Sequence, residues 1–393
     1  MLHARIRLVL LLVSGLLCGL AINTLLMTSA RILWILALLV SENGHWFALL
    51  TLILLAVAVR SGSLGTWTGR VALVLMATGL ALFATPIVQA AGTEAKWRKE
   101  FDETFGTLSG QPWFRWSKLV SIPIEIPKFE RITFRARDGA TIAYDLYRGD
   151  GVGKRPVVVV VHGGGWDSGD SSQLPELNLI LNHAGYSVAS IDYRLAPGAK
   201  WPVQRHDVED SILDMKAKAE ELQLDMSGVY VLGRSAGGQI AGALAFIDPP
   251  VCIKGLIAFY APTDLTFGYE ISEEDHWLLP RLLIRQLMGG EPMAVKENYR
   301  TASLIENVSA VSPPTLLLHG RPDSLTWFKH SERLDTRLRA AGVKSYFLDL
   351  PWGHHGFDYF VNGPGGQISR SAVLAFVESQ KSRCVVVENS SSQ

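Results

Sequence analysis

The first 92 residues of this 393-residue chain contain almost no charge. They hold five arginines, no lysine and one acidic residue, Glu42, although the whole chain balances 37 basic against 37 acidic side chains. So few charges exclude an ordinary soluble surface, which is rich in Lys, Arg, Asp and Glu. The scarcity of charge therefore predicts a transmembrane helical region over residues 1–92.

Cysteine is also scarce, and the three cysteines are Cys18, Cys252 and Cys384. Their spacing predicts neither a disulfide framework nor a metal site. The chain also lacks a glycine-rich phosphate loop, a cluster of His and Cys ligands, and a basic tract. We therefore expect no cofactor, no metal and no nucleic-acid partner, and no feature of the sequence bears on the oligomeric state.

Long apolar runs fill the charge-poor region. Residues 8–27 and 71–91 are each long enough to cross a bilayer as a helix. Between them, apolar runs at 32–40 and 46–59 are split by residues 41–45, Ser-Glu-Asn-Gly-His. We expect 41–45 to form an exposed loop, with one span over about 40–59 and an interfacial stretch before it. Four spans are the alternative, as is an intramembrane site at Glu42 and His45.

The arginines predict the orientation of these spans. Arg5 and Arg7 place the N-terminus inside, and three spans place the short loop with Arg60 and Arg70 inside as well. The remainder of the chain then lies outside an inner or plasma membrane. Four spans would leave it in the cytoplasm.

An aromatic-rich connector, residues 93–128, follows the membrane region. It includes Trp97, Phe101, Phe105 and Trp113. We expect a helix that packs on the following domain or lies at the bilayer surface; the alternative is a lid over the site. The domain itself is expected over 129–383, with a C-terminal tail at 384–393.

From residue 156 onward, short apolar runs alternate with helical patterns. This alternation is typical of βαβ units and a mainly parallel sheet, and so predicts the α/β class. Before it, residues 129–137 and 140–148 alternate apolar and polar side chains around Asp138-Gly139, which predicts a hairpin. Residues 264–298 interrupt the rhythm with an apolar helical pattern, which we expect to form an insertion above the site.

Residues 233–237 read Gly-Arg-Ser-Ala-Gly, between an apolar strand pattern at 229–232 and a helical pattern from 238. G-x-S-x-G between a strand and a helix predicts a nucleophile elbow, a sharp turn that exposes the serine, here Ser235. Upstream, the β-branched run at 156–161 ends in His162-Gly163-Gly164-Gly165-Trp166. Glycine N–H groups after a buried strand can bind a developing oxyanion, although such a run also suits a flexible surface turn.

Two later strand patterns end in candidate partners for the serine. Asp323 follows the strand at 314–320, and His355 follows the strand at 346–350, so the order is Ser, Asp, His. Histidine would take the serine proton, and the carboxylate would orient the imidazole. His354 is the alternative base, whereas Asp349 lies inside a strand and is expected to point away. The other strand-end histidines, His162 and His319, are expected to shape their own loops.

Residues 192–197, Asp-Tyr-Arg-Leu-Ala-Pro, with Trp201-Pro202 and Asp207 after them, resemble a segment of the hormone-sensitive-lipase-like esterases. Residues 162–166 resemble the oxyanion motif of that family. Segments 287–290, 299–303 and 313–316 are similar to the bacterial feruloyl-esterase-like (BD-FAE) branch. The resemblance covers about 129–383 and implies the α/β-hydrolase fold, with a mostly parallel eight-stranded sheet flanked by helices.

The resemblance also implies roles for individual residues. It implies a catalytic triad of Ser235, Asp323 and His355, and an oxyanion hole formed by the N–H groups of Gly164, Gly165 and Ala236. Two positions depart from the family pattern: Arg234 replaces an acidic or polar residue, and Pro322 stands where it can shift the acid. Arg194 and Asp207 are expected to brace a loop below the site.

These features together predict a membrane-anchored serine hydrolase that cleaves carboxylic esters through an acyl-enzyme. Trp166 and the apolar insertion indicate a hydrophobic pocket for a small-molecule or lipid-like ester. An acyltransferase or a serine peptidase would use the same triad and remains an alternative. A pseudo-hydrolase that only binds a ligand is the non-enzymatic alternative.

Overall fold

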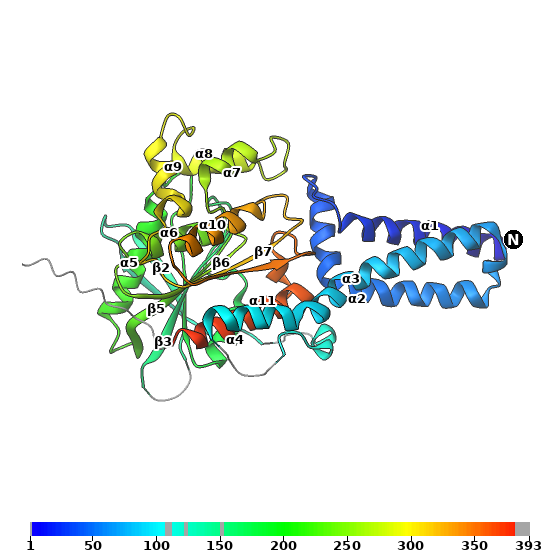
Figure 1. The fold of residues 1–393 in the computed structure, drawn as a ribbon, viewed down its shortest axis with the longest axis horizontal. Helices are drawn as coiled ribbons and strands as arrows, with labels where there is room; N and C mark the ends of the chain where they lie inside the picture. Colours follow the sequence, from blue (N-terminus) through cyan, green and yellow to red (C-terminus); the bar gives the residue numbers. More distant parts are fainter. Residues whose placement is uncertain (1, 107–111, 122–124, 150–152, 382–393) are drawn as a thin grey trace, which may run out of the picture.

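A computed structural model of the chain describes residues 2–106, 112–121, 125–149 and 153–381. A helical bundle at the N-terminal end and an α/β domain lie end to end (Figure 1). We call residues 129–381 the globular domain. The tail expected at 384–393, with Cys384, lies outside the described residues.

The globular domain is built on one eight-stranded sheet of order β1-β2-β4-β3-β5-β6-β7-β8. The strands are β1 (Glu130–Arg135), β2 (Thr141–Tyr147), β3 (Arg155–Val161), β4 (Ser187–Ile191), β5 (Leu224–Arg234), β6 (Ile253–Phe259), β7 (Thr315–Gly320) and β8 (Ser345–Leu350). β2 runs antiparallel to β1 and β4, and the other pairs are parallel. The predicted hairpin and the mostly parallel eight-stranded sheet are confirmed.

Helices cover both faces of the sheet, because its central strands are apolar on both sides. Val157, Val159 and Val161 of β3 pack into one core, whereas Val158 and Val160 pack into the other. The first core is covered by α5 (Val203–Ala217), α6 (Ala236–Phe246) and α10 (Lys329–Ala340), and the second by α4 (Pro175–His183) and α11 (Pro364–Ser379). The insertion contains α7 (Leu265–Ile271), α8 (Pro280–Met288) and α9 (Lys296–Ala302).

Three of the described helices are long and apolar enough to cross a membrane. They are α1 (Leu2–Asn23), α2 (Arg31–Arg60) and α3 (Trp67–Phe105). Leu17 and Ala21 of α1 pack against Val40 of α2 and Phe83 of α3. The N-terminus and the loop between α2 and α3 lie at the end of the bundle away from the globular domain (Figure 1).

Helix α2 corrects the prediction of an exposed loop at 41–45. The helix continues through this segment with a kink, at which Asn43 departs from helical geometry (φ −119°, ψ 23°). We call residues 31–42 the first arm and residues 44–60 the second arm. The first arm lies across the end of the globular domain, whereas the second runs along α1 and α3 (Figure 1).

Glu42, at the kink, is fully buried rather than exposed. Its carboxylate accepts hydrogen bonds from the N–H of Gly365 (2.8 Å) and from Nε1 of Trp352 (3.2 Å). Both donors belong to the globular domain. A buried carboxylate is tolerated only with such partners, and the sequence around Glu42 does not contain them. This is the physical reason why the loop prediction was wrong.

Helix α3 joins the N-terminal bundle to the globular domain without a break. Its C-terminal half is buried against the second core, with Phe101 edge-on to Tyr346 (ring centroids 5.9 Å) and Phe105 edge-on to Phe376 (5.0 Å). The described part of the connector therefore packs on the domain. None of its residues lines the cavity at Ser235, so this geometry gives the lid alternative no support.

The cysteines differ in state. Cys18 is buried in α1 with a free thiol, whereas Cys252 is disulfide-bonded. The spacing of the cysteines did not indicate this disulfide, because a single bond leaves no recognisable spacing pattern.

Candidate active site

Ser235 lies on the sharp turn between β5 and α6. Its backbone is at φ 52° and ψ −120°, a conformation that costs energy for any residue with a side chain. The turn needs small neighbours. A Cβ on Gly233 would lie 2.1 Å from the carbonyl oxygen of Gly237, and one on Gly237 would lie 2.2 Å from that of Val161. The sequence G-x-S-x-G is therefore a geometric requirement of this turn.

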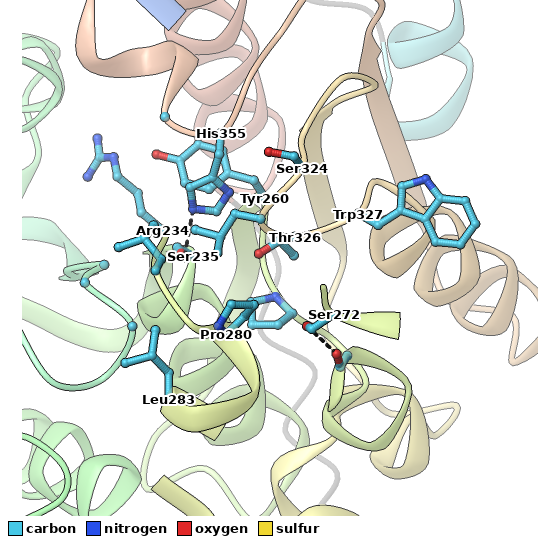
Figure 2. Close-up of a pocket in the computed structure, with 18 of the residues that line it drawn as sticks. Arg234, Ser235, Tyr260, Ser272, Pro280, Leu283, Ser324, Thr326, Trp327 and His355 are labelled. Atoms are coloured by element: carbon cyan, nitrogen blue, oxygen red, sulfur yellow. Dashed lines mark hydrogen bonds between the residues drawn. The ribbon is translucent and has the colours of Figure 1, made fainter. Parts of the chain in front are cut away.

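Ser235, His355 and Asp323 form a chain of hydrogen bonds. His355 Nδ1 donates to Asp323 Oδ2 (2.7 Å), and Ser235 Oγ lies 3.0 Å from His355 Nε2 (Figure 2). An ionised carboxylate can only accept, so the proton of a neutral imidazole resides on Nδ1. Nε2 is then free to accept the proton of the serine hydroxyl. This is the arrangement that a general base needs.

Asp323 is buried and held by its own loop. Its Oδ1 accepts from the N–H groups of Leu325 (2.9 Å) and Thr326 (2.8 Å), and His319 Nε2 lies 3.2 Å from Oδ2. Burial alone would raise the pKa of this carboxyl group. The contacts with His355 and His319 outweigh burial and bring the pKa well below its usual range. Asp323 is therefore ionised at neutral pH.

The alternative base and acid lie elsewhere. His354 Nε2 is 3.0 Å from the carbonyl oxygen of Thr24, at the end of α1. Asp349 accepts from Arg321 Nε (2.8 Å) on the surface, away from Ser235. His162 Nδ1 lies 2.7 Å from the carbonyl oxygen of the next residue, as expected for a histidine that shapes its own loop.

The residues predicted to bind the oxyanion surround the serine. Gly164 (φ 115°) and Gly165 (φ 59°) adopt left-handed conformations beside Ser235 on the same cavity. The N–H of Gly163 donates to Gln173 Oε1 (2.8 Å), which fixes the start of the glycine run. Ala236 is the first residue of α6, where backbone N–H groups have no acceptor within the helix. Their role as oxyanion donors stays a prediction.

A cavity of about 810 Å³ opens at Ser235, and its lining is largely apolar. Trp166 lines it and is fixed by a hydrogen bond from its Nε1 to Gln239 Oε1 (3.0 Å). The insertion forms one wall, which includes Leu278, Leu283 and Ile284. Figure 2 shows Leu283 and Pro280 below the serine, with Thr326 and Ser324 to one side.

A second wall comes from α2 and the loop before it, which the sequence did not connect with the site. Met27, Trp34 and Leu38 line the cavity, and we call them the N-terminal wall. The Trp34 ring centroid lies 6.4 Å from that of His355. No local pattern reveals this wall, because it depends on how the bundle docks on the globular domain.

Arg234 also has a role that the sequence did not reveal. It is buried, and its Nε donates to Asp358 Oδ2 (2.5 Å), while the Tyr260 hydroxyl donates to Oδ1 (2.5 Å). Burial raises the pKa of Tyr260 well above its usual range, so its hydroxyl stays protonated. The Tyr260 ring lies 4.4 Å from the ring of His355 (centroids). The unusual residue before the serine thus helps to hold the loop that carries the base.

Arg194 and Asp207 brace a loop, as expected. The carboxylate of Asp207 accepts from the backbone N–H (2.9 Å) and from Nη2 (2.6 Å) of Arg194, and neither residue lines the cavity. Within the described ranges, no three His, Cys, Asp or Glu side chains are arranged to hold a metal ion.

Comparison with known proteins agrees with this architecture. The BD-FAE family model matches residues 144–338, which include the central strands, the elbow and Asp323. The chain has the α/β-hydrolase fold and is similar to this family of esterases. The expected resemblance to hormone-sensitive-lipase-like and BD-FAE esterases is thereby confirmed.

The chain is 28% identical over 222 residues to a probable carboxylic ester hydrolase, LipM, of Mycobacterium tuberculosis, covering 53% of this chain and 51% of LipM. It is 27% identical over 244 residues to esterase LipC of the same organism, covering 58% and 59%. The chain thus spans between half and three fifths of these relatives. A solved esterase from Pyrobaculum calidifontis shares the fold (TM-score 0.58, 23% identity, 74% of this chain and 94% of that one).

Proposed function

We propose that this α/β hydrolase is a membrane-anchored carboxylic ester hydrolase that works through an acyl-enzyme. The observation that carries the proposal is the hydrogen-bond chain from Ser235 through His355 to Asp323, at the floor of an apolar cavity. The esterase relatives support the same reaction class. The tight packing of the turn at Ser235 and the two backbone N–H groups that donate to Asp323 support a site that is organised before substrate binds.

In this mechanism Ser235 Oγ attacks the acyl carbon while its proton passes to His355 Nε2. The electrons of the C=O bond move to the oxygen, and the N–H groups of Gly164, Gly165 and Ala236 receive the resulting oxyanion. Collapse of this intermediate breaks the bond to the alcohol oxygen, which takes the proton from His355. Water then repeats the sequence on the acyl-enzyme and releases the carboxylic acid.

The anchor consists of three spans in this proposal: α1, the second arm of α2 and the first part of α3. Three crossings put the N-terminus and the globular domain on opposite sides of the membrane. The end of the bundle away from the globular domain carries Arg5, Arg7, Arg60 and Arg70. These arginines favour a cytoplasmic location for that end. The disulfide at Cys252 favours an extracytoplasmic globular domain, because disulfides persist in oxidising compartments.

A fluorophosphonate probe tests the catalytic part of the proposal. We expect the wild-type protein in membranes to be labelled and Ser235→Ala to be unlabelled, with ester hydrolysis reduced by several powers of ten. Ser272→Ala is the matched control, because Ser272 lines the same cavity and its hydroxyl donates to the carbonyl oxygen of Gly268 (2.6 Å). Labelling that persists in Ser235→Ala, or is lost equally in Ser272→Ala, would contradict the proposal.

Two further measurements address the competing assignments. Product analysis with an added alcohol separates hydrolysis, which yields the free acid, from acyl transfer, which yields a new ester. A membrane-impermeant maleimide applied to intact cells tests the orientation. In a background without native cysteines, Met293→Cys on the globular domain should be labelled, and Ser61→Cys at the far end of the bundle should not.

A further inference from the structure

The N-terminal wall of the cavity is hydrogen-bonded to the globular domain at two residues that lie between Met27 and Trp34. The Ser324 hydroxyl donates to the carbonyl oxygen of Thr28 (2.8 Å), and the N–H of Trp277 donates to that of Ser29 (3.1 Å). The loop between α1 and α2 is therefore a fixed part of the cavity rather than a loose tether.

The first arm of α2 adds aromatic contacts to the same wall. The Trp34 ring lies edge-on to Trp277, with ring centroids 5.6 Å apart, and the Arg31 guanidinium lies 5.2 Å from the Trp277 ring. Leu38, one turn further along the arm, also lines the cavity. One side of the first arm thus faces the cavity.

Apolar side chains that lie off the cavity on the same segment remain uncovered. Ile32 is 73% exposed, and Leu33 and Ile35 of the first arm and Leu26 of the preceding loop are exposed as well. Exposed apolar residues in such density mark an interaction surface. They directly follow a membrane-spanning helix, and a short helix with this composition is favoured at the bilayer interface.

The cavity rim reaches this surface. Met27 lines the cavity, is half exposed, and lies four residues beyond the end of α1 at Asn23, within about 14 Å along an extended chain. Ile271 and Trp327, each 37% exposed, also belong to the lining. An apolar surface therefore continues from the bilayer-facing loop to Ser235.

From this continuity we propose that the site takes an ester with a long acyl chain directly from the bilayer. The chain enters beside Met27 and lies between the N-terminal wall and the insertion, with its carbonyl carbon at Ser235. The inference rests on the proposed ester hydrolysis and names its substrate class. Each methylene group prefers an apolar phase to water by about fourfold, so a continuous apolar path spares the chain transfer through water. A short, water-soluble ester gains nothing from such a path.

The test uses the full-length protein in phosphatidylcholine vesicles with two esters that share one leaving group. The ratio of kcat/KM for p-nitrophenyl palmitate, dissolved in the vesicles, to that for p-nitrophenyl acetate, dissolved in water, isolates the bilayer route. We expect Ile32→Asp to lower this ratio at least about tenfold, because a carboxylate displaces the first arm from the interface. Met293→Asp is the matched control, since Met293 is 77% exposed and belongs to the loop between α8 and α9, two helices that lie away from the bundle (Figure 1). We expect its ratio to stay within twofold of wild type.

A second variant tests the acyl path without altering the membrane surface. Leu38→Trp narrows the cavity from the N-terminal wall and should shift the preferred acyl chain to shorter lengths across a series from acetate to palmitate. Equal ratios in Ile32→Asp and Met293→Asp, together with an unshifted chain-length profile in Leu38→Trp, would overturn the inference and leave ester hydrolysis standing. A wild-type protein that is not labelled by the fluorophosphonate probe and hydrolyses neither ester would overturn both the proposed ester hydrolysis and the present inference.

Discussion

Replacement of Asp323 by asparagine tests whether the carboxylate behind the histidine works as the geometry requires. The substitution is nearly isosteric, and the amide oxygen can still accept from Leu325 and Thr326, which now bond to Oδ1. We therefore expect the loop and the fold to survive. What is lost is the negative charge 2.7 Å from His355 Nδ1.

The magnitude follows from the charges. When His355 takes the serine proton, an imidazolium forms beside the carboxylate, and two unit charges about 4 Å apart attract by about 4 kcal/mol at an effective dielectric of 20. This corresponds to about a thousandfold in rate. An asparagine amide also favours the wrong imidazole tautomer, and together the two effects reach about ten-thousandfold in a triad of this kind.

The assay is kcat for p-nitrophenyl acetate at neutral pH, with thermal unfolding as a check on the fold. Asp349→Asn is the matched control, because Asp349 lies near the end of strand β8 and pairs with Arg321 on the surface. We expect it to retain activity within about twofold. Asp323→Asn with more than a tenth of wild-type kcat, or an equal loss in Asp349→Asn, would refute the assignment of Asp323 as the acid.

Three further predictions concern stability and are measured by thermal or chemical unfolding in detergent. Asp358→Ala leaves the buried Arg234 guanidinium without its carboxylate and should cost about 3–5 kcal/mol; a cost below 1 kcal/mol would show that the pair is not buried as described. Glu42→Ala removes the acceptor of the Gly365 N–H and should cost about 1–3 kcal/mol, whereas Glu42→Gln should cost less. Burial lowers the pKa of His330 to about 3, so the unfolded chain binds a proton that the folded protein does not between pH 6.5 and 3. Stability should therefore fall as the pH drops through this window, and His330→Gln should flatten that slope; an unchanged slope would contradict the burial.

The parts of the fold that were predicted correctly are those that local sequence determines. The β-branched strand at 156–161 and the glycines around Ser235 can adopt few other structures, so sheet, hairpin and elbow were predictable. Asp323 and His355 each follow the carboxyl end of a strand, which predicted that both lie at the same end of the parallel sheet. These two side chains lie where that argument put them, within hydrogen-bonding distance of each other.

The parts that were missed depend on contacts between distant segments. Glu42 is the only acid in 92 residues, and this rarity was the one available signal that it has a structural partner. Its donors come from residues more than 300 positions later, so no local pattern could favour a helix over a loop there. Trp34 is missed for the same reason: its hydrophobic stretch is explained equally well by the membrane. Membrane-facing positions and pocket-lining positions are both occupied by apolar residues, so residue type alone does not distinguish them.

The unbroken helix α3 has a consequence for how the enzyme would meet its substrate. At 39 residues it is about 58 Å long, roughly twice the hydrocarbon thickness of a bilayer. In the proposed membrane anchor it would hold the globular domain at one height and one tilt. An enzyme held in this way searches a plane rather than a volume. Its rate would depend on the mole fraction of ester in the facing leaflet, and diluting that leaflet with inert lipid would slow turnover even when the bulk ester concentration is unchanged. Esters in the opposite leaflet would be out of reach until they flip.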